Sequence, residues 1–71
     1  MYIVLEIQKN NGQVSILPFQ YEDILDAEAK YHTVLAAAAK SSVDVHTAMI
    51  MTEYGFVLKC EHYTHNEEVE E

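Results

Sequence analysis

The sequence predicts an α+β protein in which a four-stranded antiparallel sheet carries one helix on one face. Two stretches rich in alternating apolar and polar residues flank a single helical stretch, and each contains a glycine turn signal. The order of elements is therefore ββαββ. A chain of 71 residues is long enough for one domain, which we place at 1–65. We expect the acidic tail at 66–71 to be disordered.

The first hairpin is indicated by Asn11-Gly12, because both residues tolerate the positive φ of a two-residue type I′ turn. This turn joins an expected strand at 2–8 to a second at 13–20. Pro18 cannot donate to a strand ladder, so the second strand is predicted to be an edge strand or to be bulged there. The turn also predicts three cross-strand pairs: Lys9 with Val14, Ile7 with Ile16, and Leu5 with Pro18.

Both faces of this hairpin are apolar. Strand alternation places Ile3, Leu5, Ile7, Val14 and Ile16 on one face, and Tyr2, Val4, Leu17, Phe19 and Tyr21 on the other. We expect the helix to cover the first face. The second face, which would also carry Ile50, Glu6, Lys59 and Glu61, is then expected to remain a half-apolar patch.

The helix is predicted to run from about Asp23 to Lys40. Asp23 is a good N-cap residue, and Lys40 suits the negative end of the helix dipole. Apolar residues cover roughly 200° of the helical wheel, whereas a surface helix needs little more than about 100°. This width predicts burial on two sides, and we therefore expect a homo-oligomer, most simply a dimer.

Two further strands are expected at 43–52 and 56–63, joined by a turn at Tyr54-Gly55. This register places His46 opposite Tyr63. It also aligns Cys60 with Met49 and Met51, so Cys60 is expected to be a core residue. The order of the strands within the sheet is left open by the sequence.

Net charge restricts the partners of this chain. The formal charge is −8, and the four basic residues are all lysines, so bidentate arginine–phosphate contacts are absent. We therefore expect binding neither to nucleic acid nor to an anionic membrane, and a basic protein surface is the compatible partner. A single cysteine fits a reducing compartment, and we expect a cytoplasmic protein.

Four residues are candidates for ligand binding: Glu28, Tyr31, His32 and His46. Glu28 falls inside the apolar arc of the helix, and His32 follows it at i+4. A carboxylate beside an imidazole orients the ring and raises its basicity, as general bases and metal ligands require. In the alternative interpretation, Glu28 reaches to the rim, His32 belongs to an interface network, and His46 forms a cross-strand aromatic pair.

A second group of residues, Cys60, His62 and His65, has the ligand types of a zinc site. No CxxC motif or second cysteine accompanies them, so the pattern favours a core position for Cys60 over metal binding. We expect no cofactor and no catalytic residue.

The segment Tyr31–His46, together with Tyr2–Gln8 and the Gly55 hairpin, resembles small uncharacterised proteins of Gram-positive gut bacteria and their phages or prophages. The resemblance implies a mobile-element context and transfers no activity.

The sequence thus favours a non-enzymatic, acidic homo-oligomer that binds a basic protein surface, for example a phage accessory or inhibitor. One alternative is a small-ligand binding or sequestering protein whose pocket lies at the subunit interface. Another is a metalloprotein or small hydrolase that uses the histidines and Cys60.

Overall fold

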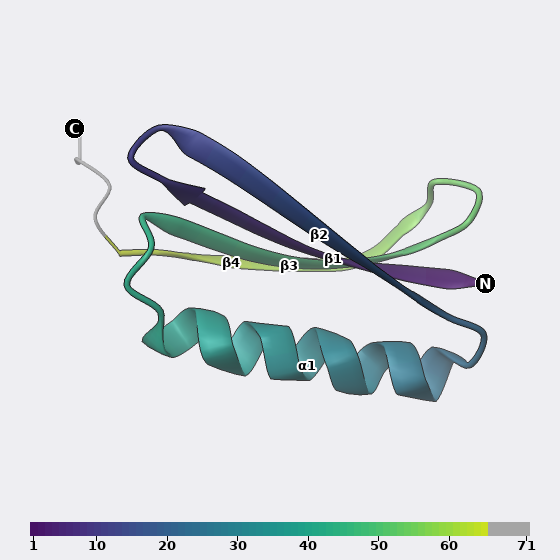
Figure 1. Cartoon of the computed structure of the whole chain (residues 1–71). Helices are drawn as coiled ribbons and strands as arrows, with labels where there is room; N and C mark the ends of the chain where they lie inside the picture. Colours follow the sequence, from purple (N-terminus) through teal and green to yellow (C-terminus); the bar gives the residue numbers. More distant parts are fainter. Residues whose placement is uncertain (66–71) are drawn as a thin grey trace.

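The computed structural model describes residues 1–65 and confirms the predicted fold class (Figure 1). Four antiparallel strands form one sheet in the order β2-β1-β3-β4, and one helix lies against one face of it. The elements are β1 (Tyr2–Asn10), β2 (Gln13–Tyr21), α1 (Ile24–Lys40), β3 (Val45–Thr52) and β4 (Val57–Thr64). The acidic tail predicted at 66–71 lies outside the described residues.

The β1–β2 hairpin has the predicted turn and register. Asn11 and Gly12 adopt φ values of 56° and 81°, as a type I′ turn requires. The three predicted pairs, Lys9 with Val14, Ile7 with Ile16 and Leu5 with Pro18, are all present. Pro18 lies in an edge strand, where its missing N–H interrupts no ladder to a further strand.

Helix α1 begins at the predicted cap and buries one stripe. The Asp23 carboxylate accepts a hydrogen bond from the Leu25 N–H at 2.8 Å. The buried residues of the helix follow the i, i+4, i+7, i+11 spacing of a single stripe: Ala27, Tyr31, Val34 and Ala38. The second buried side that the wide apolar arc predicted is not buried within this chain, since Leu25 is 70% exposed. Within residues 1–65 no helix has the length and apolar character needed to cross a membrane.

The second hairpin is shorter at its start than predicted and ends one residue later. Val43 is held outside β3 because its N–H donates to the Ser41 hydroxyl at 3.0 Å. Phe56 belongs to the turn, where its N–H donates to the Thr52 hydroxyl and its carbonyl accepts from the Thr52 N–H. The predicted pairing of His46 with Tyr63 is confirmed.

The helix covers the opposite sheet face from the one predicted. Val4, Ala48 and Ile50 are completely buried beneath α1, so the covered face is the one that contains Val4. Strand alternation could not make this choice, because both faces are apolar. Small residues favour the observed face: Ala48 on β3 and Ala27 and Ala38 on α1 are all fully buried, and their small side chains let the helix approach the sheet closely.

Chain topology also bears on this choice. Strands β2 and β3 run parallel with β1 between them, so α1 is a crossover connection. Crossovers between parallel strands are strongly biased to one hand, which ties the covered face to the strand order. The strand order was the part of the topology that the sequence left open.

The core between α1 and the sheet is thin. Within residues 1–65 seven hydrophobic residues are buried, and three of them are the alanines Ala27, Ala38 and Ala48. Tyr31 is the largest side chain among them, and its burial raises the pKa of its phenol, with a smaller contribution from the nearby carboxylate of Glu61. Beside this core, the Lys30 ammonium lies 4.1 Å from the centre of the Phe19 ring and joins the helix to β2.

Candidate interaction surface

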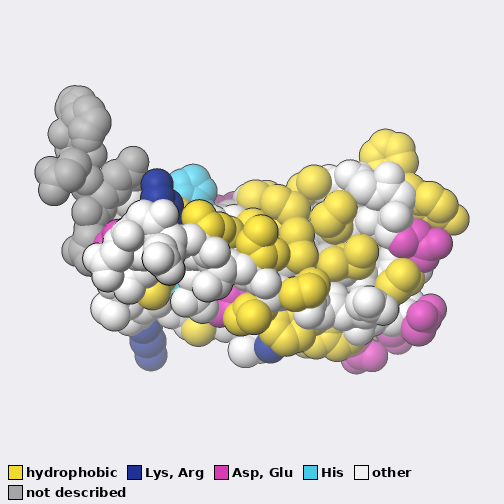
Figure 2. Space-filling model, turned by 45° about the horizontal axis from the view of Figure 1, so that its top comes forward, with side chains coloured by type: hydrophobic (Ala, Val, Ile, Leu, Met, Phe, Trp, Pro, Cys, Tyr) yellow, Lys and Arg dark blue, Asp and Glu magenta, His cyan; other side chains and the backbone are white. Residues whose placement is uncertain are grey.

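The sheet face away from α1 is apolar and uncovered, and we call it the open face. Figure 2 shows hydrophobic side chains gathered over this side of the sheet. The pairing registers place on it Ile3, Leu5 and Ile7 of β1, Val14, Ile16 and Pro18 of β2, Val45, Thr47, Met49 and Met51 of β3, and Val57, Cys60 and His62 of β4.

One continuous apolar row crosses the open face. In the central row Pro18 pairs with Leu5, Leu5 with Met49, and Met49 with Cys60. In the adjacent row Ile16, which is 57% exposed, pairs with Ile7, and the row continues with the polar residues Thr47 and His62. Such cross-strand neighbours normally pack against another layer of a protein.

The open face carries almost no charge. Among the described residues its only formally charged side chain is Lys9, at one end of β1. Glu6 and Glu61 lie on the same row as Ala48 and therefore belong to the covered face. A chain with a net charge of −8 thus keeps the acidic groups of residues 1–65 off this apolar face.

A group of acidic side chains lies at one end of the molecule. The β2–α1 connection and the β3–β4 turn lie at the same end, and acidic side chains are visible there (Figures 1 and 2). This end carries Glu22, Asp26 and Glu53 beside the strongly exposed rings of Tyr54 and Phe56. The N-terminal ammonium pairs with Glu53 at 2.8 Å, and Glu22 and Asp26 add negative charge beside the aromatic surface.

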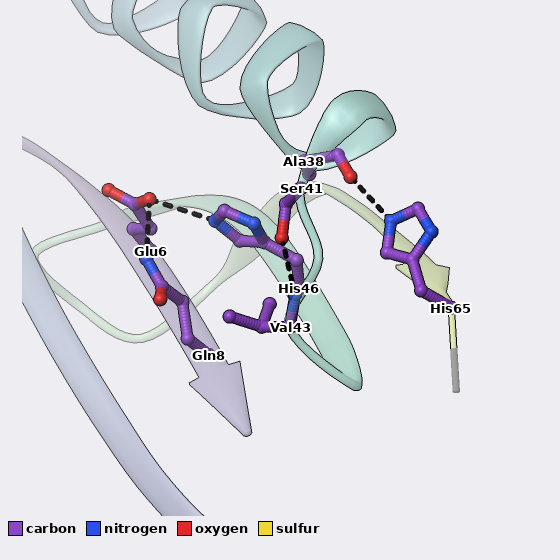
Figure 3. A network of polar contacts seen from close by, with 7 residues as sticks. All are labelled: Glu6, Gln8, Ala38, Ser41, Val43, His46 and His65. Carbon is purple, nitrogen blue, oxygen red and sulfur yellow. Dashed lines mark hydrogen bonds and ion pairs between the residues drawn. The ribbon is translucent and has the colours of Figure 1, made fainter. Parts of the chain in front are cut away.

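A polar network lies under the C-terminal end of α1 (Figure 3). His46 is only 4% exposed, and its Nε2–H donates to the Glu6 carboxylate at 2.8 Å. The Gln8 side-chain amide donates to the same carboxylate oxygen at 3.0 Å. His46 Nδ1 is buried and has no hydrogen-bond partner among the described residues. The two donors satisfy the Glu6 carboxylate at the boundary of the core.

The four predicted ligand-binding residues do not converge on one concave site. Glu28 pairs with Lys59 at 3.3 Å, and Lys59 lies opposite Ile50 on β3. Ile50 is four residues from His46, which corresponds to about 13 Å along a strand. The other two residues lie on α1, where Tyr31 is a buried core residue and His32 is exposed with its ring edge-on to Tyr31.

The three predicted metal-ligating residues are also separated. Cys60 and His62 lie on the open face, whereas the His65 Nε2–H donates to the Ala38 carbonyl at 2.7 Å. Among residues 1–65 no group of three histidine, cysteine, aspartate or glutamate side chains is arranged to hold a metal ion. The prediction that Cys60 is a core residue is wrong: it is aligned with Met49, but this row lies on the open face, so the thiol is exposed.

A polar hollow of about 450 Å³ lies under the β1–β2 turn. It is lined by neutral hydrogen-bonding side chains and one valine: Gln8, Asn10, Asn11, Gln13, Ser15 and Val43. None of the residues predicted to bind a ligand lines this hollow.

Sequence reasoning missed the role of Glu6 as the partner of His46. The available signal was alternation, which places Glu6 on the same face as Val4. Only the adjacency of β1 and β3 brings the two side chains together.

Comparisons with known proteins identify no relative: no protein-family model matches this chain, and neither the curated proteins nor the solved structures contain a significant match.

Proposed function

We propose that this chain is a non-enzymatic interaction protein that acts by binding other proteins. The observation that carries this proposal is the segregation of its surface into an apolar face free of acidic groups and an acidic, aromatic end. Single-chain soluble proteins rarely expose contiguous apolar patches of more than a few hundred Å² without a binding role. Exposed aromatic side chains such as Tyr54 and Phe56 are likewise enriched at protein interfaces.

The polar groups of the fold support binding more than catalysis. Among the described residues, His46 is the histidine with a carboxylate partner, and it is buried. Its contact with Glu6 gives both side chains a hydrogen-bond partner at the boundary of the core. General acid–base catalysis requires the group to reach a substrate proton within hydrogen-bond distance. Burial of His46 under α1 works against that requirement.

The acidic end favours a basic protein partner. Exposed carboxylates speed the encounter with a positively charged surface, and Tyr54 and Phe56 can contact the apolar stems of lysine or arginine. An accessory or inhibitor protein of a phage or another mobile element is the form of this function that the sequence resemblance favours.

The test uses a fluorescent twelve-residue peptide of alternating lysine and leucine, with a glutamate–leucine peptide as the control probe. We expect the lysine peptide alone to bind, with an affinity that falls steeply between about 50 and 300 mM salt. The triple substitution Glu22→Gln, Asp26→Asn and Glu53→Gln is expected to weaken binding at least tenfold.

A matched variant has the same net charge as this triple variant. It separates the effect of the acidic end from the effect of the net charge of the chain. It carries Glu67→Gln, Glu68→Gln and Glu70→Gln, and we expect it to bind the lysine peptide as the wild type does. Equal loss of binding in both triple variants would contradict recognition at the acidic end. Absence of binding at low salt would contradict the basic-partner proposal itself.

A second candidate function, binding of a small uncharged polar ligand, is favoured by the hollow under the β1–β2 turn. Its amide and hydroxyl groups suit a neutral oligosaccharide. With maltotriose as the probe, this function predicts a rise in melting temperature that Gln13→Ala removes. An unchanged melting temperature across a panel of neutral oligosaccharides would contradict it.

A further inference from the structure

We propose that a second copy of this chain covers the open face, so that two sheets pack face to face as a symmetric β-sandwich dimer. This inference rests on the proposed function as an interaction protein and names the occupant of its apolar surface. The basic partner would then contact the acidic end, which the dimer leaves outside the sandwich.

The thin core is the first reason for a second layer. Of the seven hydrophobic residues buried among residues 1–65, only Val4, Tyr31, Val34 and Ile50 are larger than alanine. Domains of this size commonly need a disulfide, a metal or self-association to supplement such a core. Cys60 is the single cysteine of the chain, and the described residues contain no metal-binding group of three, so self-association is the support that the chain can supply.

The area of the open face is sufficient for a stable dimer. Eight residues at about 3.3 Å and four strands at about 4.8 Å give a flat footprint of roughly 500 Å² per copy. With full overlap two copies therefore bury about 1,000 Å², which meets the minimum of about 1,000 Å² that a specific protein interface should clear. The accessible surface area is larger than this flat footprint, because the sheet is pleated and its side chains project from it.

Charge is the third reason, and it also discriminates between occupants. A two-fold contact brings each patch against its own copy, so acidic groups within it would repel one another. The open face contains none of the acidic side chains of residues 1–65, and Lys9 lies at its end. A basic partner would find no carboxylate to pair with on this face, whereas an apolar copy of the same face is complementary to it.

The proposed packing places the two-fold axis near the middle of the sheet, between β1 and β3. Leu5 and Met49, which are paired across these strands, then form the centre of the interface. Aligned sheets pack about 10 Å apart, which two opposing layers of leucine, isoleucine and methionine fill. Ile16 on β2 contributes a side chain that is 57% exposed in one copy.

The experiment is sedimentation equilibrium of the full chain between about 5 and 200 μM. We expect a mass of twice 8.1 kDa at the high end of this range. Leu5→Lys and Ile16→Lys each place two like charges in the dimer interface and are expected to raise the dimer Kd at least tenfold. Position 16 is mostly exposed in a single copy, so Ile16→Lys is expected to leave the fold of the subunit intact. The far-UV circular dichroism of this variant should match that of the wild type.

Leu25→Lys is the matched control, since it makes the same change of charge at an exposed leucine on α1, away from the open face. We expect it to leave the Kd unchanged. A wild-type mass of 8.1 kDa throughout, assemblies that grow without limit, or a dimer sensitive only to Leu25→Lys would each overturn the inference.

The lysine–leucine peptide assay on the same variants separates this inference from the proposed function. A monomeric wild type that binds the peptide at its acidic end refutes only the second copy. A dimer that fails to bind the peptide supports the sandwich and refutes the basic-partner proposal. If Ile16→Lys abolishes peptide binding by a monomeric chain, the open face belongs to the partner and the sandwich is refuted.

Discussion

Replacing Ile16 with alanine gives a graded measure of how much the open face contributes to association. Ile16 is 57% exposed in one copy, so a little over half of its side-chain surface is available to a second copy. Complete burial of an isoleucine side chain stabilises by about 1.5–3 kcal/mol. The exposed part, less what alanine retains, corresponds to about 1 kcal/mol per subunit and about 2 kcal/mol per symmetric dimer. The dimer Kd should therefore rise roughly thirtyfold.

The assay for Ile16→Ala is sedimentation equilibrium across the wild-type Kd, with Leu25→Ala as the matched control. Leu25 is 70% exposed and lies on α1, so its truncation removes a similar apolar area outside the open face. We expect its Kd to stay within about threefold of the wild type, a difference below 1 kcal/mol. A Kd for Ile16→Ala that also stays within this limit would refute the reasoning, because Ile16 would then not become covered.

Three further predictions concern the single subunit. Ile50→Ala, at a fully buried position, should lower the free energy of unfolding by about 2–5 kcal/mol, and chemical denaturation showing less than about 1 kcal/mol would contradict the assigned core. Glu6→Ala leaves the donors of His46 and Gln8 without their acceptor and should lower the free energy of unfolding by about 1–3 kcal/mol. Glu6→Gln retains an acceptor oxygen and should lower it less. Equal losses of unfolding free energy for the two variants in chemical denaturation would argue against the network. Burial raises the pKa of Tyr31, so the unfolded chain loses this proton first as pH rises past about 10, and stability should fall above that pH. Tyr31→Phe should show a smaller fall in melting temperature between about pH 9 and 11.5, and an identical fall would contradict the burial effect.

Local signals predicted most of the fold. Asn11-Gly12 determined both the turn and the register of the first hairpin, because a two-residue turn permits one pairing. Asp23 marked the start of α1 through its side-chain oxygen. The predicted strand boundaries were wrong where side chains form hydrogen bonds with the backbone. The Ser41 hydroxyl accepts a hydrogen bond from the Val43 N–H, and β3 begins two residues later than predicted, at Val45.

The covered face could not be predicted, because it depends on contacts between distant segments. Both Leu5 and Val4 fit a protein core, and alternation only says that they lie on opposite faces. Adjacency of β1 and β3, the crossover made by α1 and the small side chain of Ala48 decide between them. Each of these is a tertiary property.

Predictions about the candidate site residues were restricted in the same way, because their contacts also join distant segments of the chain. Glu28 and His32 have helix spacing, which suggested a pair, yet Lys59 of β4 is the partner that Glu28 contacts. His46 was correctly placed opposite Tyr63, but its polar partner Glu6 comes from the other neighbouring strand. Predictions within one hairpin therefore succeeded, and those that needed the full strand order did not.

In the proposed dimer, the open face of one copy lies against the open face of another. Isotope-filtered NMR on a mixture of labelled and unlabelled chains tests this contact directly. Face-to-face packing of the two sheets predicts intermolecular NOEs among the methyl groups of Leu5, Ile7, Ile16 and Met49. Intermolecular NOEs confined to Leu25 and the alanines of α1, or none at concentrations where the chain should be dimeric, would contradict it.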